Sequence, residues 1–445
     1  MPNGAIPPAA VPSAPVPAAP APSGQLPPGA VPQGMVPQGA VPQGATNIVP
    51  LPEAVTAHES GAYSLMELTH FAIAQHPALI RSRADIDSAK GDRVQAALYP
   101  NPRFETNNPA VFAGRNTQVN YGFQQDMVVK GKIRLDKAAA DQQVRKMEAR
   151  FALQRMHVLT EVRQQYYDTL AARERVVVAE QFVRLSQEAL DTAQKLQKAG
   201  QGSSTDVLLI NTELERARVN LENAHTQFKG EMLQLASVSG IPDVQIIELE
   251  GSLFDPLPLF NPEEIRRYLV TQSSYMELSS AEITRNKIKL RREEVEPYPN
   301  IRFGPAYAIS TPDNRGQFWL SLVFDIPVWD LNQGGIRAQR AEVQRSVAEM
   351  DATKIELLRE LSETSTRHVA ARNTMERFRT AILPNAQQAQ QLVGEGFQKG
   401  LFDVNRVLQA RRQLLDANDD MIDALERAWS TAAELAGMLQ RETFP

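Results

Sequence analysis

The sequence contains no cysteine, which excludes disulfide bonds, thiolate metal sites and an acylated cysteine anchor within its 445 residues. It also has no run of about 18 apolar residues, the length that a membrane-spanning helix needs. Aromatic residues make up only 6% of the chain, which favours long helices with thin apolar seams over one thick core. The net charge of −5 gives no reason to predict nucleic acid as a partner. Any membrane contact must therefore use strands or amphipathic surfaces.

Catalytic and metal-binding patterns are missing as well. The histidines lack the close helical pairing of a metal site, and none lies near a nucleophile motif. The segment Gly200-Gln-Gly202 lacks the further glycines and the lysine of a phosphate loop. We predict no catalytic residue, no cofactor and no metal ligand. We expect each of the six histidines to lie on the surface or at an interface: His58, His70, His76, His157, His225 and His368.

The first 52 residues contain no charged residue and about half of the 30 prolines, with Val-Pro-Gln-Gly repeated between Val31 and Gly44. Proline-rich composition without apolar periodicity predicts an unpacked, polyproline-like tail, which we assign to residues 1–60. The segment lacks the basic start and the continuous apolar core of a secretory signal. We therefore expect that the start of translation lies upstream or that this N-terminus is a processed one.

A heptad pattern occurs twice, two hundred residues apart. It begins at Val207 and again at Val407, and apolar residues continue at the a and d positions for five heptads in each copy, except at Glu231 and Thr431. Each copy follows a glycine, Gly200 or Gly400, and an Asp-Val pair. A glycine turn between helices predicts an antiparallel helical hairpin, so the chain contains a duplicated hairpin whose tips lie at residues 200–206 and 400–403.

The two halves share one order of predicted elements, and we assign them to residues 61–250 and 251–445. A helix opens the first half at the capping box of Ser64 and Glu67, and another opens the second half at Asn261-Pro262. Each opening helix is expected to run to a proline stop, at residues 99–104 or 298–303. Nearly seventy residues follow the strands in each half, at about 132–199 and 336–399, with scarcely a helix breaker apart from Pro384 and the glycines near Gly394. A helix of that length extends on the order of 100 Å.

Between the proline stop and the long helix, each half has two strands with alternating apolar residues. The alternation includes Val119, Tyr121 and Phe123 in the first half, and Phe318, Leu320, Leu322 and Phe324 in the second. Short turns at 113–116 and 311–316 make each pair a hairpin. Strands of about ten residues are long enough to cross an outer membrane, but four of them cannot close a barrel. Since open strand edges are costly in lipid, three chains are expected to share a barrel of ~12 strands.

The duplicated order of helix, proline stop, hairpin, long helix, glycine turn and heptad helix resembles the TolC-like outer-membrane efflux proteins, from Ser64 to about Gln440. The segments 98–102 and 125–132 look most like the branch paired with heavy-metal exporters of the cobalt-zinc-cadmium type. The resemblance implies a mainly α fold with a small membrane β component, assembled as a homotrimeric channel-tunnel. It also implies an outer-membrane location with a periplasmic helical tunnel. The partners it implies are outer-membrane lipid, a periplasmic adaptor (membrane fusion) protein and an inner-membrane efflux pump.

This resemblance assigns roles to the two hairpin tips. It places adaptor docking at Gly200, Thr205, Asp206, Val207, Gly400, Asp403 and Val404, and the gate at Arg406 and Gln409. Some members of the family present acidic residues at the gate, where this chain has a basic and a neutral residue. The residues alone also allow a purely structural role for each of these positions. In that interpretation the glycines form hairpin turns only, the two aspartates are helix caps, and Arg406 is a solvated or interhelical charge.

Two other functions compete with the passive exit duct. A soluble or peripheral coiled-coil scaffold fits the heptads, but it does not explain why aromatic residues such as Phe123 and Trp319 gather on the strands. A periplasmic adaptor also contains a helical hairpin, but one flanked by a lipoyl-like β domain, whereas this chain has two hairpins and little other β structure. The exported substrate, the adaptor and the pump are not identified by the sequence.

Overall fold

A computed structural model describes residues 62–107, 117–241, 248–311 and 315–444. The predicted tail and the turn at 113–116 lie outside these residues, as does the centre of the turn at 311–316. Most of the described chain is helical. Within the described ranges, no helix is both long enough and apolar enough to cross a membrane.

Each half opens with two helices instead of the single helix that the sequence predicted. They are α1 (Leu65–Gln75) and α2 (Pro77–Ala96) in the first half, and α5 (Pro262–Thr271) and α6 (Ser274–Glu294) in the second. The prediction of one continuous helix was wrong in the first half because His76 precedes a proline, which holds it in an extended conformation. The Nδ1 atom of His76 then accepts a hydrogen bond from the Ala78 amide, 3.2 Å away, and caps α2. The predicted capping box of Ser64 and Glu67 is confirmed.

The long helices follow the predicted plan, with one interruption. The first hairpin consists of α3 (Lys132–Lys198) and α4 (Ser204–Val238). The second consists of α7 (Gln333–Arg377), the π-helical turn η1 (Phe378–Ile382), α8 (Leu383–Gln398) and α9 (Val404–Met438). The π turn ends two residues before Pro384, which has no amide hydrogen and whose ring crowds the carbonyl four residues earlier. The 67-residue helix α3 has no proline and is unbroken.

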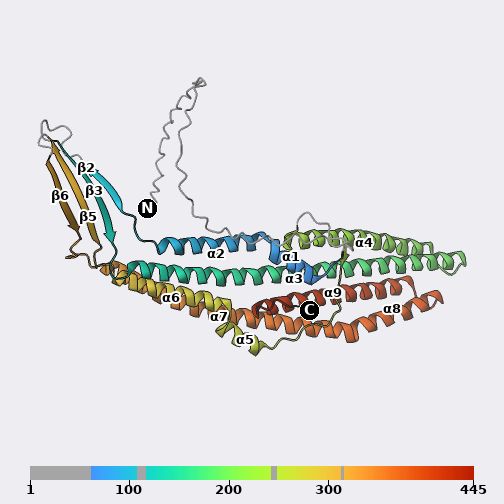
Figure 1. Cartoon of the computed structure of the whole chain (residues 1–445). Coiled ribbons are helices and arrows are strands. Elements are labelled where there is room, and N and C mark those ends of the chain that lie inside the picture. Colours follow the sequence, from blue (N-terminus) through green and yellow to red (C-terminus); the bar gives the residue numbers. More distant parts are fainter. Residues whose placement is uncertain (1–61, 108–116, 242–247, 312–314, 445) are drawn as a thin grey trace, which may run out of the picture. The chain divides into compact units, whose positions relative to one another are not determined.

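Four strands form one antiparallel sheet in the order β2-β3-β5-β6, which Figure 1 shows beyond one end of α3. Their bounds are β2 (Arg103–Asn107), β3 (Thr117–Met127), β5 (Ile301–Thr311) and β6 (Arg315–Val323). Each half supplies one antiparallel pair, and β3 pairs with β5 to join the halves. Phe324, expected in the last strand, lies one residue beyond β6. A separate parallel pair joins β1 (Ala62–Tyr63) to β4 (Glu248–Leu249).

The main apolar core lies where both halves meet, and Trp429 of α9 is its largest fully buried side chain. Its indole ring stacks on the Tyr167 ring of α3, with ring centroids 4.0 Å apart. The indole Nε1 donates a hydrogen bond to the Leu253 carbonyl at 2.9 Å, so its polar atom is satisfied. The core therefore ties the two halves into one folded unit.

The two heptad helices are unequally covered. Helix α9 packs against α3, α7 and α8, and its a and d residues are buried from Val407 to Leu435. Helix α4 packs mainly along α3. On α4, Leu208 and Leu233 are 67% and 72% exposed. The chain thus leaves one face of α4 with apolar side chains in solvent.

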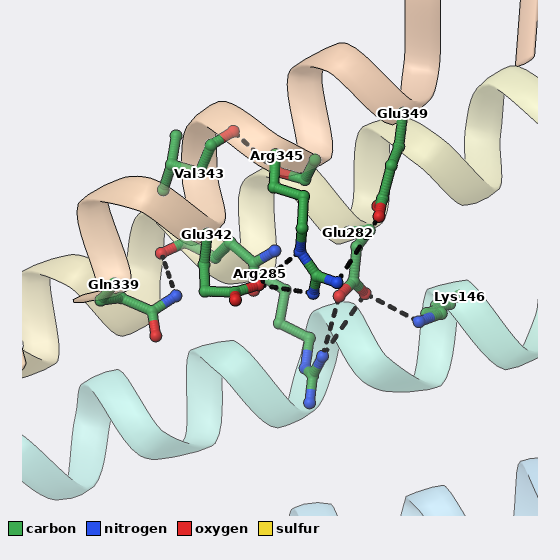
Figure 2. A network of polar contacts seen from close by, with 10 residues as sticks. Lys146, Glu282, Arg285, Gln339, Glu342, Val343, Arg345 and Glu349 are labelled. Carbon is green, nitrogen blue, oxygen red and sulfur yellow. Dashed lines mark hydrogen bonds and ion pairs between the residues drawn. The ribbon is translucent and has the colours of Figure 1, made fainter. Parts of the chain in front are cut away.

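A network of polar contacts connects α3, α6 and α7 (Figure 2), in which the Gln339 amide of α7 donates to the Asn286 carbonyl of α6 at 3.3 Å. Glu282 of α6 accepts a hydrogen bond from the Lys146 ammonium of α3 at 2.9 Å and another from Arg285 at 3.1 Å. On α7, Arg345 pairs with Glu342 and lies 3.6 Å from Glu349. Burial alone would raise the pKa of Glu282, but the hydrogen bond and charge of Lys146 hold it below its usual value. The Glu282 carboxylate is therefore charged at neutral pH and links the two halves.

Candidate functional site

The two hairpin tips have the same backbone geometry. Gly200 and Gly400 have φ angles of 74° and 71°, in the left-handed region that glycine adopts without strain. One residue later, the Gln201 amide donates to the Leu196 carbonyl at 2.9 Å, and the Leu401 amide donates to the Gly396 carbonyl at 2.8 Å. These bonds close each long helix with a Schellman motif. The predicted glycine turns are confirmed.

The helices that leave the tips are capped at equivalent positions, Ser203 and Asp403. The Asp206 carboxylate accepts a hydrogen bond from the Ser203 amide at 3.1 Å, and the Asp403 carboxylate accepts one from the Arg406 amide at 3.1 Å. The two Asp-Val pairs are therefore not at equivalent positions in the two helices. Asp403 is the N-cap, whereas Asp206 is three residues inside its helix and corresponds to Arg406. The two tips place opposite charges at this equivalent position.

One apolar cluster brings the two tips together. Val207 of α4 and Val404 of α9 both pack in it, with Leu190 of α3 and Phe397 of α8. Figure 1 shows the α3-α4 turn and the α8-α9 turn at the same end of the helices. Val404, predicted as a docking residue, is 4% exposed and so supports the cluster from inside. The other predicted docking residues include four that are exposed to solvent, namely Gly200, Thr205, Gly400 and Asp403.

The two tips carry a large and a small residue in reversed order at two equivalent positions. The first tip has Leu196 and Gly202, and the second has Gly396 and Phe402 at the equivalent positions. A Cβ atom on Gly396 would overlap the Phe402 ring, and a Cβ atom on Gly202 would lie 3.3 Å from the Leu196 Cβ atom. Each tip therefore accommodates one large side chain only. This reciprocal exchange preserves the packing of the turn.

Arg406, predicted as a gate residue, lies at the second tip with its guanidinium carbon 4.9 Å from the centroid of the Phe402 ring. This distance is typical of a cation-π contact. Gln409 is exposed on the same helix. The sequence interpretation missed Leu208 and Leu401, which expose 67% and 71% of their surfaces at the tips. The signals available were that Leu401 directly follows the turn glycine Gly400 and that Leu208 lies outside the heptad positions.

The four-stranded sheet has two chemically different faces. One face carries exposed apolar side chains on all four strands, which come into register as Phe104, Phe123, Tyr121, Tyr307, Phe303, Phe318 and Leu322. The opposite face carries polar pairs. Gln124 donates to the Glu105 carboxylate at 2.6 Å, and Arg302 donates to the Asp126 carboxylate at 3.1 Å. Such alternation fits a strand with lipid on one side and water on the other.

A half-buried aspartate, Asp168 of α3, lies away from the tips, where α3 packs against α9. Asp168 lines a cleft of about 530 Å³ together with Glu426 and Arg367. Burial, then the charges of Glu426 and Glu231, raise the pKa of Asp168 to about 7. Arg175, which pairs with Glu426 at 2.6 Å, opposes this shift. Asp168 was not predicted, although an acid directly between the aromatic pair Tyr166-Tyr167 and the apolar residues Leu170 to Ala172 was a visible signal.

The Asp168→Asn variant is expected to be more stable than the native protein at pH 8 and nearly equal to it at pH 4. A raised carboxyl pKa stabilises the fold below the unfolded value near 4. That contribution is lost as the pH rises through about 7. The asparagine removes a penalty on the order of 1 to 3 kcal/mol after allowance for partial solvent exposure. Thermal unfolding between pH 4 and 8 measures the difference.

The matched control is Asp191→Asn, an exposed aspartate on the same helix. It should leave the pH profile of unfolding unchanged. A constant difference between Asp168→Asn and the native protein across this pH range would contradict the assignment.

No group of three histidine, cysteine or carboxylate side chains in the described ranges is arranged to hold a metal ion. His368 departs from the prediction that every histidine is a surface or interface residue. It is 6% exposed inside the chain, and its Nδ1 atom lies 3.0 Å from the Thr431 hydroxyl. Burial lowers the pKa of His368, so its neutral form fills the space between α7 and α9.

Comparison with known proteins agrees with this architecture. A family model described as outer membrane efflux protein matches residues 68–240 and 282–439. The cobalt-zinc-cadmium resistance protein CzcC of Cupriavidus metallidurans is 24% identical over 397 residues, which cover 89% of this chain and 94% of that protein. The nickel-cobalt-cadmium resistance protein NccC of Alcaligenes xylosoxydans xylosoxydans is 23% identical over 313 residues, 68% of this chain and 69% of that protein.

Solved structures share the fold at low sequence identity. The CusC crystal structures match 84% of this chain and 91% of the CusC chain, with a TM-score of 0.73 and 14% identity. The open-state outer membrane channel MtrE of Neisseria gonorrhoeae matches 84% of this chain and 88% of its own, with a TM-score of 0.71 and 14% identity.

Proposed function

Since this chain belongs to the outer membrane efflux protein family, we propose that it exports divalent metal ions, as the passive exit duct of a three-part system. Family membership establishes efflux across the outer membrane, and the prediction of a TolC-like channel component is confirmed. The main observation in support of a duct is the sheet, which has one apolar and one polar face and lies at one end of the long helical hairpins. The soluble scaffold gives no reason for an exposed face with Phe104, Phe123 and Phe318.

Three copies of the chain are proposed to form the duct. The sheet ends in two strands, β2 and β6, that each have one neighbour within the described residues. Unpaired strand edges are costly in lipid, so β6 of one copy is proposed to pair with β2 of the next. Three sheets of four strands then make ~12 strands, enough to enclose a lumen. The exposed apolar residues of α4, such as Leu233, are proposed to be covered in the same assembly.

The two tips are proposed to dock a periplasmic adaptor, which connects the duct to an inner-membrane pump. The tips lie together and present exposed groups from both halves, including Thr205, Asp403 and Leu401. Equivalent turns with different side chains let an adaptor contact two related sites on each copy. The two structural repeats are proposed to span residues 61–250 and 251–445, each ending in one of these hairpins. The pump, rather than this chain, supplies the energy of export.

Metal ions are proposed as the substrate because CzcC and NccC, which cover most of this chain, are both metal resistance proteins. The experiment is deletion of this chain in its native host, followed by growth on cobalt, zinc, cadmium and nickel salts. The deletion strain should become sensitive to at least one of these ions and recover with the plasmid-borne gene. Unchanged metal resistance, with increased sensitivity to organic compounds only, would contradict the metal substrate.

The Arg406→Asp variant is expected to shift the ion selectivity of the duct toward cations. If Arg406 lies at the narrowest part of a trimer, three positive charges become three negative ones, and cations are attracted to the entrance. Single-channel reversal potentials in planar bilayers under a potassium chloride gradient measure the change. The control is Arg427→Asp, an exposed arginine of the same helix far from the tip. Equal selectivity of native protein and Arg406→Asp would show that Arg406 does not line the constriction.

A further inference from the structure

Arg411 of α9 is a buried cation for which the described part of the chain supplies no partner. It is 8% exposed, and its Nε and Nη1 atoms are covered and make no hydrogen bond. No ion pair joins it to a carboxylate of the described residues. Arginine stays protonated in proteins, and a buried charge without a partner is strongly unfavourable. The position therefore calls for a compensating negative charge.

The surroundings of Arg411 are positively charged. It lines a small pocket of about 50 Å³ between α3, α4 and α9, together with Arg216 and Arg412. Glu213 is the one carboxylate in the pocket lining, and its oxygen lies 3.6 Å from both Arg216 and Arg412. The single carboxylate is thus shared by the two outer arginines. Glu188 and Glu213 favour the charged form of Arg411 from farther away, but burial has the larger effect and lowers its pKa.

We propose that this pocket binds a small inorganic anion of halide size, such as chloride, beside the Arg411 guanidinium. A water molecule needs roughly 10 to 15 Å³ of such space, so the pocket accommodates one halide ion with a water molecule. Charge-assisted hydrogen bonds from a guanidinium to an anion are strong. Ser186, which is 2% exposed and lines the same pocket, adds a hydroxyl donor. Because Nε and Nη1 are covered, a shift of the guanidinium must accompany ion entry.

A second copy of the chain is a less suitable source of the negative charge. A carboxylate from outside would have to carry its side chain and backbone past Arg216 and Arg412 into a pocket of about 50 Å³. A single ion needs no such path. An anion at this position would hold α9 of the second hairpin to α4 of the first, about two turns of helix from the tips. Its binding would therefore stabilise the joint between the hairpins.

Bromide tests the proposal directly because its anomalous scattering identifies it. Crystals of the complete assembled protein grown in sodium bromide should show an anomalous peak at hydrogen-bonding distance from the Arg411 guanidinium. A map without a peak at Arg411 would overturn the proposal. A carboxylate of a neighbouring copy in contact with Arg411 would overturn it as well.

Thermal unfolding of the assembled protein in detergent provides an independent test. Replacing gluconate with chloride at constant ionic strength should raise the unfolding temperature of the native protein by about 2 °C. The Arg411→Met variant should not respond to chloride, while the exposed control Arg427→Met should respond like the native protein. Equal chloride responses of native protein and Arg411→Met would contradict the site. If Arg411→Met does not fold, the bromide map of the native protein decides.

Discussion

Replacing Leu322 of β6 with arginine is expected to destabilise the membrane-inserted protein by at most about 2 to 4 kcal/mol, the cost of a cation at the lipid face of the bilayer midplane. The cost falls toward the membrane interfaces, and Leu322 is one residue from the end of β6. Leu322 is 56% exposed and lies opposite Phe303 of β5 on the apolar face of the sheet. In lipid the arginine must leave water without gaining a partner. Urea unfolding of the protein in lipid vesicles measures the loss, and the amount in the outer membrane should fall with it.

The neighbouring Ser321 provides the matched control, because it is on the opposite, polar face of the same strand. Ser321→Arg should insert normally, since its side chain faces water in the proposed duct. Equal insertion and equal urea midpoints for the two variants would show that the Leu322 face does not contact lipid. Such a result would contradict the proposed orientation of the sheet.

The Gly396→Leu variant is expected to damage the second tip and to reduce export and adaptor binding strongly. A Cβ atom at residue 396 overlaps the Phe402 ring, so either the ring or the turn must move. Overpacking of this kind costs about 1 to 3 kcal/mol. Displacement of Phe402 would also remove the surface on which the Arg406 guanidinium lies. Cross-linking of the adaptor to Asp403→Cys in intact cells, with metal efflux in parallel, measures both effects.

The double variant Gly396→Leu with Phe402→Gly is the matched control, because it copies the Leu196 and Gly202 pair of the first tip. It should restore the stability of the turn by removing the overlap. Recovery of cross-linking as well would show that packing alone matters at this tip. If Gly396→Leu by itself leaves cross-linking and efflux at native levels, the second tip is not a docking site.

The sequence predicted the elements whose physical causes are local. The glycine turns at Gly200 and Gly400 require left-handed backbone, and both have it. The alternation in β3 and β6 predicted strands, and the register aligns their apolar residues on one face. The break at His76 has an equally local cause, because Pro77 holds His76 in an extended conformation.

Features that depend on contacts between distant residues could not be predicted in the same way. The heptads of α4 and α9 look equivalent in sequence, yet only α9 is packed on several sides. The raised pKa of Asp168 depends on burial first and then on the charges of Glu426 and Glu231, which are distant in sequence. The two Asp-Val pairs look equivalent in sequence but are not, because the N-cap residues Ser203 and Asp403 occupy the equivalent positions. The docking and gate roles of the tip residues remain predictions.

Native mass spectrometry of the complete protein, purified from outer membranes in detergent, tests the central claim most directly. The larger sheet of the described residues has four strands, too few to close a barrel, so the proposed duct requires several copies to share one lumen. A single species with about three times the mass of one chain is the result that this account predicts. A monodisperse monomer that retains its sheet would contradict it.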